Sequence, residues 1–324
     1  MDVDLFDNDL RFSFDYFFRK REDVIAGANA SVSSTLGVAL AAQNLYEFSN
    51  EGFEFSIDYK TQLNDNLKLS ALLNFSKSRE KAVFIDETLQ EDPFMRANLT
   101  ETGGFTGLRR GYISNGLFQS QEEIDQWAIQ DDNGNASIQP GDVRYVDLND
   151  DGVIDVRDQK VFGDGSKPAM NYSLNLGAEY KNFALSVLLT GAAGYDIYLD
   201  GEAQAPLRNG FNGYDYQIDY WTPTNTTAAF PRITDGGFND NNYKYSDFWL
   251  RNGKHIRFKN INLSYTFPKR KENATFNEIR IFCTGYNLFV IKDFDEDFDP
   301  QMGSGLGWYY PQTKSLTFGV NVSL

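Results

Sequence analysis

Residues 170–189 have the sequence MNYSLNLGAEYKNFALSVLL. Up to Tyr180, apolar side chains occupy every second position, with asparagine, serine, glycine or glutamate between them. A period of two puts one kind of side chain on each face of a β-strand. Lys181 and Asn182 interrupt the pattern as a tight turn, and the alternation resumes at Phe183. The segment therefore predicts a β-hairpin with one apolar face and one polar face.

The same alternation recurs along the chain of 324 residues. Between Leu10 and Phe18, for example, apolar or aromatic residues alternate with charged and hydroxyl residues. The predicted strands cover residues 9–19, 52–63, 66–78, 170–180, 182–191, 256–267, 278–290 and 314–324. Because several are joined by tight turns, they predict an all-β protein, an antiparallel up-and-down meander of about eight strands.

The connections between these strands alternate between short and very long. Short turns are expected at 64–66, 181–182 and 268–277, and long connections at 20–51, 79–169, 192–255 and 291–313. Transmembrane β-barrels have this arrangement, with tight periplasmic turns at one rim and long extracellular loops at the other. The pattern therefore predicts an antiparallel transmembrane β-barrel segment with long extracellular loops and a periplasmic C-terminus.

The composition excludes several other kinds of protein. With 46 acidic and 30 basic residues, the net charge is -16, so nucleic acid is not an expected partner. The single cysteine, Cys283, rules out a disulfide scaffold, and the single histidine, His255, rules out a multi-histidine metal site. No apolar run approaches the ~18 residues of a membrane-spanning helix.

The N-terminus gives no sign of export. It begins Met1-Asp2-Val3-Asp4, which lacks the positive flank and apolar core of a secretion signal. The chain is therefore expected either to be intracellular or to lack its true beginning.

A soluble antiparallel sheet with one face on a protein core would show the same alternation. The mean hydropathy of -0.47 suits a soluble protein. Transmembrane barrels are also polar overall, however, because the lumen and the loops lie in water. The alternative function is therefore a soluble or surface Ca²⁺-dependent carbohydrate-binding β module.

Residues 147–158 have the spacing of a calcium-binding loop. The predicted ligands are the side chains of Asp147, Asn149, Asp151 and Asp158, the backbone carbonyl of Val153, and Asp155 through a water molecule. Gly152 at the sixth position permits the sharp turn. Aspartate instead of glutamate at the last position makes bidentate binding less secure. We expect Ca²⁺, or Mg²⁺, to stabilise the long loop structurally; a solvated turn without an ion is the alternative.

Aromatic residues are concentrated in two of the long connections. Sugars and peptides stack on aromatic rings, so these rings are candidates for ligand contact. The candidates are Tyr214, Tyr216, Tyr220, Trp221, Trp308, Tyr309 and Tyr310. Such rings also pack loops together or form an interfacial belt. The acidic run at 293–299 could bind a second cation, but an exposed loop is the preferred interpretation.

Catalysis is not expected from this sequence. Nucleophilic chemistry needs a base beside the nucleophile, and His255 is the only histidine. No serine lies in a G-x-S-x-G elbow. The chain is therefore predicted not to be an enzyme.

Eight stretches of the sequence, taken in their order along the chain, resemble a known family. They are YISNGLFQS (112–120), GDVRYVDLNDDGVID (141–155), NLGAEYKNF (175–183), SDFWLR (246–251), IRFKN (256–260), GYNL (285–288), DP (299–300) and YPQT (310–313). Together they resemble the C-terminal portion of SusC/RagA-type TonB-dependent outer-membrane transporters. The terminal TFGVNVSL (317–324) also resembles the signal that outer-membrane assembly machinery recognises.

The resemblance implies a barrel of about 22 strands in the outer membrane of a Gram-negative cell, with an N-terminal plug in its lumen. It implies import of an oligosaccharide or peptide nutrient, driven by TonB through the plug, with a SusD-like surface lipoprotein over the mouth. This chain would supply part of the barrel wall, in contact with outer-membrane lipid, and the ligand-facing loops. Because it lacks the plug, it is expected to be a truncation, a split gene product or a cut chain, and not active alone.

Overall fold

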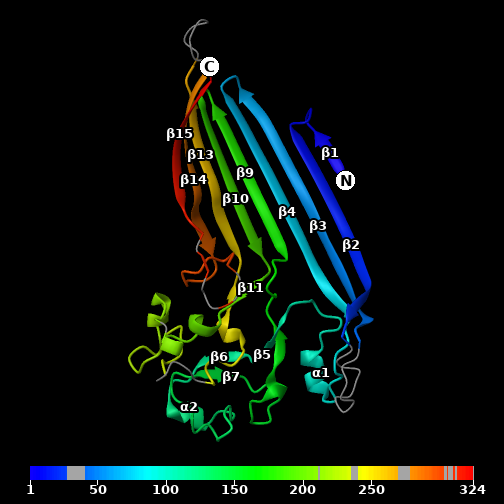
Figure 1. The fold of residues 1–324 in the computed structure, drawn as a ribbon, viewed down its shortest axis with the longest axis vertical. Helices are drawn as coiled ribbons and strands as arrows, with labels where there is room; N and C mark the ends of the chain where they lie inside the picture. Colours follow the sequence, from blue (N-terminus) through cyan, green and yellow to red (C-terminus); the bar gives the residue numbers. More distant parts are fainter. Residues whose placement is uncertain are drawn as a thin grey trace.

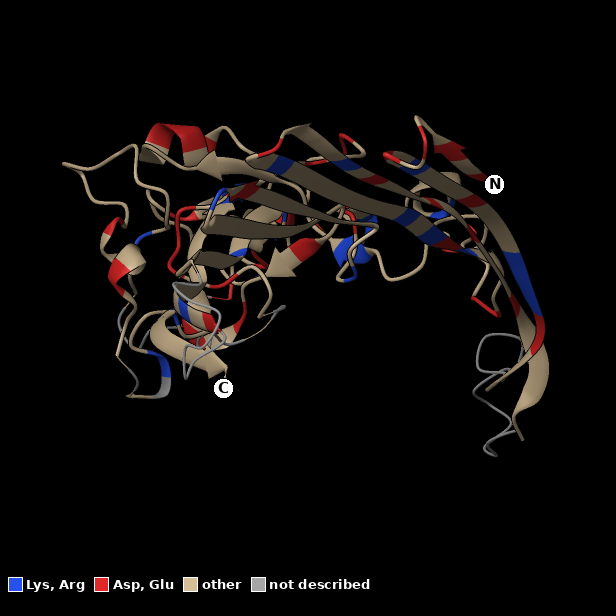
Figure 2. Ribbon diagram, turned by 90° about the horizontal axis from the view of Figure 1, so that it is seen from above, with Lys and Arg blue, Asp and Glu red and all other residues tan. Residues whose placement is uncertain are grey.

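The structure is a computed structural model that describes residues 1–27, 41–210, 212–234, 240–268, 278–302, 305, 309–310 and 312–323. Its main element is a nine-stranded antiparallel sheet in the order β1-β2-β3-β4-β9-β10-β13-β14-β15 (Figure 1). The strands are β1 Asp2–Leu5, β2 Leu10–Ala26, β3 Gln43–Asn64, β4 Leu67–Phe84, β9 Met170–Tyr180, β10 Phe183–Ala193, β13 His255–Thr266, β14 Glu278–Lys292 and β15 Ser315–Ser323. Seen from above, the sheet is an open arc with the two chain termini at opposite ends (Figure 2).

The predicted antiparallel meander is confirmed. Each of the eight predicted segments overlaps one strand of the sheet. Strands β3 and β4 extend further at the loop end than the sequence pattern indicated, to Gln43 and Phe84. The short edge strand β1 was not predicted, because its four residues are too few to establish an alternation.

Pairing in register carries the alternation straight across the sheet. One row of paired residues comprises Phe12, Ile57, Leu73, Leu174, Leu189, Phe258 and Phe289. The adjacent row on the other face comprises Ser13, Ser56, Asn74, Ser173, Thr190 and Arg257. A slip of one residue in any strand would move its whole apolar set to the polar face. The apolar pattern therefore fixes the register.

Short turns join neighbouring strands at one end of the sheet. Between β3 and β4, the side-chain oxygen of Asn64 accepts the backbone N–H of Asn66 at 2.9 Å. Between β9 and β10, Lys181 adopts the left-handed conformation with φ 53°. Residues 269–277 of the third predicted turn, and residues 28–40 of the first long connection, lie outside the described residues.

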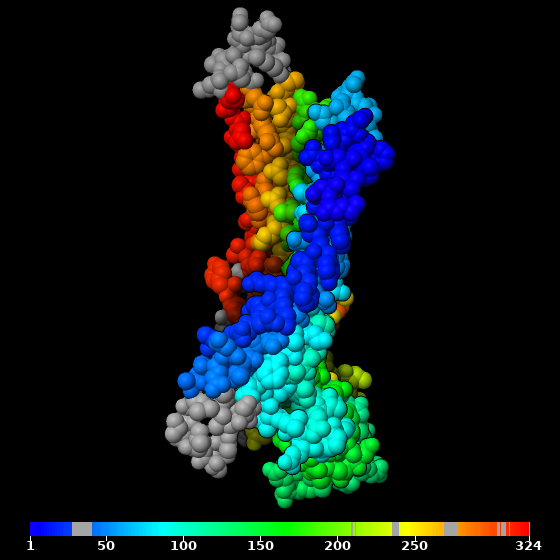
Figure 3. All heavy atoms as spheres, turned by 90° about the vertical axis from the view of Figure 1, so that its right-hand side faces the viewer, coloured from blue at the N-terminus to red at the C-terminus, as the bar shows by residue number. Residues whose placement is uncertain are grey.

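The long connections fold together at the other end of the sheet (Figures 1 and 3). They contain the helices α1 Pro93–Leu99 and α2 Gln121–Asp125, and three strand pairs: β5 Arg109–Gly111 with β8 Lys160–Phe162, β6 Ser114–Leu117 with β7 Val143–Tyr145, and β11 Asp196–Tyr198 with β12 Leu250–Asn252. Short 3-10 turns complete this region: η2 Val156–Asp158, η3 Gly201–Ala203, η4 Arg208–Gly210, η5 Asp215–Ile218 and η7 Asp247–Trp249. No helix among the described residues is long and apolar enough to cross a membrane.

The hydrophobic core lies in the loop region and not against the sheet. Two large buried clusters are centred on Tyr145 and Trp249, both of which are completely buried. Many large apolar side chains on the strands, in contrast, are exposed, among them Phe18, Leu176 and Phe318. The loops thus have a protein core of their own, whereas no described segment of the chain covers the apolar face of the sheet.

Candidate functional site

The apolar face of the sheet forms an exposed band. Leu176 in β9 is 41 % exposed and Phe318 in β15 is 73 % exposed. At the turn end the band finishes in a row of aromatic residues, in which Tyr180 pairs with Phe183 and Phe183 with Tyr265. The rings of Phe183 and Tyr265 lie 4.7 Å apart. Aromatic rows of this kind mark the interfaces of transmembrane barrels.

A second aromatic row closes the band at the loop end. It comprises Phe14, Phe55, Phe75 and Tyr172, and the stacked rings of Phe55 and Phe75 lie 5.3 Å apart. From Tyr172 to Tyr180, strand β9 runs about 26 Å at a rise of about 3.3 Å per residue. Transmembrane strands need roughly 9–11 residues, and β9 has 11. The band therefore has the length of a membrane-spanning surface.

Charged residues follow the second aromatic row on the same face. Beyond Phe75 in β4, this face carries Lys77, Arg79 and Lys81. Glu51 of β3 pairs with Arg79 in register, and Arg79 also forms an ion pair of 3.1 Å with Asp164 in the loop region. In β4 this change from aromatic to charged residues marks the end of the apolar band at the loop side, whereas in β2 the band continues through Tyr16 and Phe18.

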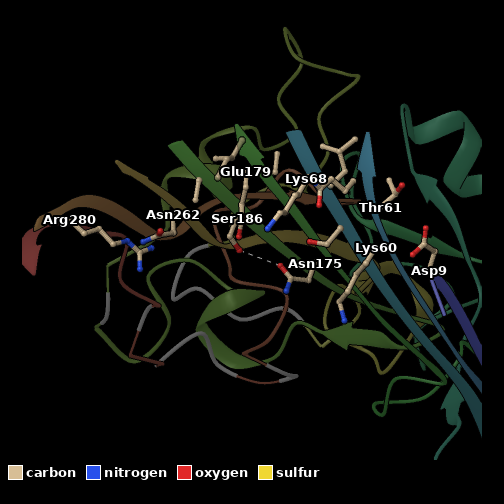
Figure 4. A pocket seen from close by; sticks show the side chains of 16 residues that line it. Asp9, Lys60, Thr61, Lys68, Asn175, Glu179, Ser186, Asn262 and Arg280 are labelled. Atoms are coloured by element: carbon tan, nitrogen blue, oxygen red, sulfur yellow. Dashed lines mark hydrogen bonds between the residues drawn. The ribbon is translucent and has the colours of Figure 1, made fainter. Parts of the chain in front are cut away.

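The opposite face of the sheet is polar and contains a hollow of about 630 Å³ near the turn end (Figure 4). Its polar lining comes from six strands and the turn before β2: Asp9, Lys60, Thr61, Gln62, Lys68, Ser70, Asn175, Glu179, Ser186, Asn262 and Arg280. Ser186 donates a hydrogen bond to Asn175 at 3.4 Å. Lysine, arginine, serine and asparagine side chains can bind water or a polar partner, and Leu69, Gly177, Ala178, Ala184 and Leu185 complete the lining.

The predicted cation loop is closed largely by its own hydrogen bonds. Asp147 Oδ2 accepts the N–H of Gly152, and Asp158 accepts those of Leu148 and Asp155, each at 2.8 Å. The pKa of Asp158 is raised because burial disfavours its charged form. Within the part of the chain that the structure describes, no three acidic, histidine or cysteine side chains converge as a metal site.

Two features of this loop bear on cation binding. The guanidinium of Arg157 lies 2.7 Å from the carboxylate of Asp151 and 2.9 Å from that of Asp155, so it neutralises two of the predicted ligands. Asp147 Oδ1, in contrast, is buried and finds no hydrogen-bond partner within the described ranges of the chain. An orphaned buried carboxylate oxygen suits a cation, whereas the position of Arg157 means that a cation would have to compete for Asp151 and Asp155.

Four of the predicted ligand-contacting rings pack inside the loop region. Tyr214 and Tyr216 stack with ring centres 5.4 Å apart, and both meet the ring of Phe298 edge-on. Tyr220 is half-buried, and its backbone forms a β-bridge with Phe230. Trp221 is 8 % exposed. These four rings therefore pack the loops together, which was the alternative to ligand contact.

The second predicted group lies nearer the surface. Tyr310 is 89 % exposed and Tyr309 is 40 % exposed. Trp308 lies outside the described residues. Tyr309 and Tyr310 therefore stay candidates for ligand contact.

The interpretation of residues 293–299 as an exposed acidic loop is wrong for two of its carboxylates. Glu296 is 5 % exposed and lies 2.5 Å from Arg251. Asp299 accepts two hydrogen bonds from Arg257, at 2.6 and 2.7 Å. The sequence offered no local signal for these pairs, because the partners are separated by 45 and 42 residues.

Comparisons with known proteins are consistent with this geometry. No protein-family model matches the chain. It is 26 % identical over 344 residues to TonB-dependent receptor P3 of Formosa agariphila, a match that covers 99 % of this chain and 33 % of the receptor. It is 25 % identical over 321 residues to TonB-dependent receptor SusC of Bacteroides thetaiotaomicron, covering 96 % of this chain and 29 % of SusC. The chain thus spans about a third of the length of these relatives.

Solved structures show the same fold. The RagAB peptide transporter superposes with a TM-score of 0.73 at 17 % identity, covering 99 % of this chain and 34 % of that chain. The RagAB peptide importer in its open-open state gives a TM-score of 0.72 at 18 % identity. The predicted resemblance to the C-terminal portion of SusC/RagA-type TonB-dependent transporters is confirmed, and so is the barrel-wall fold class. The relatives are named as receptors and transporters and not as enzymes.

Proposed function

We propose that this chain forms part of the wall and the extracellular loops of a TonB-dependent outer-membrane importer. The observation that carries the proposal is the exposed apolar band between two aromatic rows. A soluble protein would bury a surface of this size against a protein core, whereas lipid covers it in a membrane. The similarity to TonB-dependent receptors and to the RagAB fold supports the same function.

The parent importer would take up an oligosaccharide or peptide nutrient. RagAB is described as a peptide transporter, which supports the peptide class. By analogy with SusC and RagAB, the partners of the parent importer would be a SusD-like surface lipoprotein at the loop end and TonB, acting through the plug of the importer. Because the last strand ends beside the short turns, opposite the loops, its C-terminus would lie in the periplasm. The chain alone would not transport.

The only cysteine of the chain provides a direct test of the lipid-facing band. Cys283 pairs with Leu263 and Phe318 in register, which places it on the apolar face. A nitroxide attached to Cys283, with the chain folded in lipid vesicles, should collide readily with oxygen and rarely with a water-soluble nickel reagent. The matched control carries the label on the polar face, through Ser186→Cys in a Cys283→Ser background. It should show the reverse preference.

Two results would contradict the membrane assignment. One is equal access of the nickel reagent to both labels. The other is a label at Cys283 that neither reagent reaches, since that result would indicate a dry protein core. The soluble carbohydrate-binding alternative also predicts a monodisperse chain without detergent, whereas a barrel wall should aggregate.

We propose in addition that residues 147–158 hold Ca²⁺, or Mg²⁺, as a structural ion. Support comes from the spacing of the oxygen ligands and from the buried Oδ1 of Asp147, which no described residue meets with a hydrogen bond. Hard divalent cations prefer such oxygen ligands. When bound, the ion would stabilise the turn before β8 and displace Arg157 from its carboxylates. Calorimetric titration of the ion tests this proposal.

A further inference from the structure

A buried polar cluster fastens the segment after β14 to the sheet. We call residues 293–302 the latch segment. Both carboxylate oxygens of Asp299 accept hydrogen bonds from Arg257 of β13. The next residue, Pro300, is fully buried, and its carbonyl accepts a hydrogen bond of 2.6 Å from the hydroxyl of Tyr195. Two neighbouring residues of the latch segment are therefore held by two side chains from elsewhere in the chain.

His255 lies beside this cluster and is 3 % exposed. Its Nδ1 is 3.0 Å from the carbonyl oxygen of Gly253 and 3.2 Å from the hydroxyl oxygen of Tyr195. Tyr195 has one hydroxyl hydrogen, which it donates to Pro300, so its oxygen can only accept from His255. Both neighbours of Nδ1 are thus acceptors. The hydrogen bonds therefore assign the proton of the neutral ring to Nδ1.

The other ring nitrogen has no such support. His255 Nε2 is buried and has no hydrogen-bond partner among the residues that the structure describes. A proton there would create a buried N–H without an acceptor, which costs the full desolvation of that group. It would also place a positive charge near Arg257, whose side chain is 3 % exposed. Both oxygens of the nearby carboxylate, Asp299, are already bound to that guanidinium.

Other charged and titratable groups surround the ring. They are Tyr172, Tyr195, Lys254, Arg257, Lys292 and Asp299. The hydroxyl of Tyr172 in β9 donates a hydrogen bond to the His255 carbonyl, and Lys254 forms an ion pair of 3.4 Å with Asp293. Lys292 is the residue of β14 that pairs with His255. Burial lowers the pKa of His255, and Arg257 lowers it further, against the opposing influence of the Gly253 carbonyl and Asp299. His255 precedes the apolar part of β13 and lies at the loop end of the sheet.

We propose that protonation of His255 at acid pH releases the latch segment from the sheet, so that the contact between the sheet and the loop region depends on pH. The neutral ring supports Tyr195 while Tyr195 holds Pro300. The protonated ring repels Arg257 and needs an acceptor at Nε2, so the contacts of Asp299 and Pro300 open. The ion pair between Glu296 and Arg251 lies outside this cluster and does not depend on His255. Because this ion pair persists, only the end of the latch segment opens. The proposal goes beyond nutrient import and does not depend on it.

The first test uses the fact that His255 is the only histidine. In the full chain labelled with ¹⁵N-histidine, NMR should show one imidazole in the Nδ1–H form at neutral pH. Its titration midpoint should lie below the ordinary value of about 6.5. An Nε2–H form, or a midpoint at or above that value, would overturn the proposal. This measurement needs no variant.

The second test follows the latch segment by hydrogen–deuterium exchange. After correction for intrinsic rates, exchange of residues 297–302 in the wild type should accelerate as pH falls from about 6.5 to the measured midpoint, by about tenfold for each pH unit between these two values. His255→Asn keeps a donor for the Gly253 carbonyl but cannot titrate in this range, so its latch segment should remain protected. Residues of β7 serve as an internal control and should not change. Identical pH dependence in wild type and His255→Asn would overturn the proposal.

Discussion

Tyr172 of β9 covers Gly191, its direct partner in β10. The tyrosine hydroxyl reaches across to β13 and donates a hydrogen bond of 2.8 Å to the carbonyl of His255. A Cβ atom at position 191 would collide with the tyrosine ring and with that carbonyl. An aromatic ring over a strand glycine supplies the packing that glycine lacks. One side chain thus joins three strands where the sheet meets the loops.

This contact predicts that Gly191→Ala destabilises the folded chain by about 1–3 kcal/mol, as overpacking typically does. The measurement is urea unfolding of the chain folded in detergent micelles. Tyr172→Ala removes the ring that obstructs the new methyl group. The double variant should therefore lose less stability than the sum of the two single variants. Additive losses would show that the ring and the glycine do not constrain each other.

The strands and their faces could be predicted because the polarity of each side chain matches the face of the sheet on which it lies, as β9 illustrates. From Tyr172 to Tyr180 the alternation is unbroken, so the pattern reveals both the strand and its register. The pattern is broken at Leu188 and Leu189, where the pairing of β10 with β13 shifts. The extension of β3 back to Gln43 depends on pairing with β2. Local sequence does not contain such long-range information.

The candidate sites were less predictable because partners distant in sequence decide them. Glu296 and Asp299 have an acidic local sequence, yet Glu296 is buried against Arg251, and Asp299, which binds Arg257, has only 13 % of its side chain exposed. The ring of Tyr216 could have faced a ligand, but Phe298 from another connection packs against it. Residue type identified groups capable of these contacts. Only the fold determined which group each would meet.

A charge in the middle of the apolar band should be costly in a lipid bilayer. Leu176 lies midway between the aromatic residues Tyr172 and Tyr180 of β9. Leu176→Lys should cost about 2–4 kcal/mol of folding free energy in lipid vesicles if it meets the bilayer midplane. Ser173→Lys, on the polar face of the same strand, is the matched control and should cost much less. Equal tolerance at both positions would contradict the membrane assignment.

Residues 147–158 should bind Ca²⁺, and the affinity should depend on Asp147, which favours binding, and on Arg157, which opposes it. Calorimetric titration should give binding heat for the wild type and none for Asp147→Ala, because that variant loses a predicted ligand. Arg157→Ala should bind more tightly, since the guanidinium no longer competes for Asp151 and Asp155. Asp65→Ala in the β3–β4 turn controls for loss of charge and should bind as the wild type does. Absence of binding heat in both the wild type and Arg157→Ala would exclude cation binding by residues 147–158.

The ion pair of Arg251 and Glu296 should matter far more than a surface pair. Only 18 % and 7 % of these side chains are exposed. Glu296→Gln leaves a largely buried guanidinium without its counter-charge, which costs about 3–5 kcal/mol. Asp58→Asn breaks the surface pair with Lys60 and should cost no more than about 1 kcal/mol. Urea unfolding compares the two variants, and similar losses would show that burial does not strengthen the pair.

Asp131 should make the loop region sensitive to strong acid. Its carboxylate accepts hydrogen bonds from the backbone N–H groups of Asn133, Asn135 and Ser137 and from the Ser137 hydroxyl, at 2.6–2.9 Å. Burial alone would raise the pKa of Asp131, but these hydrogen bonds outweigh burial and lower it to about 2. In the unfolded chain the pKa is near the ordinary value of 3.8.

Because the folded state holds the Asp131 proton less tightly, its stabilising contribution is complete above the ordinary pKa. The contribution falls as pH drops towards the folded value of about 2. Asp131→Asn removes the titrating group. The difference in unfolding free energy between wild type and this variant should therefore be constant above about pH 5 and shrink steadily below about pH 4. Denaturant titrations at a series of pH values measure it, and a difference that does not change with pH would show that the carboxylate charge contributes nothing.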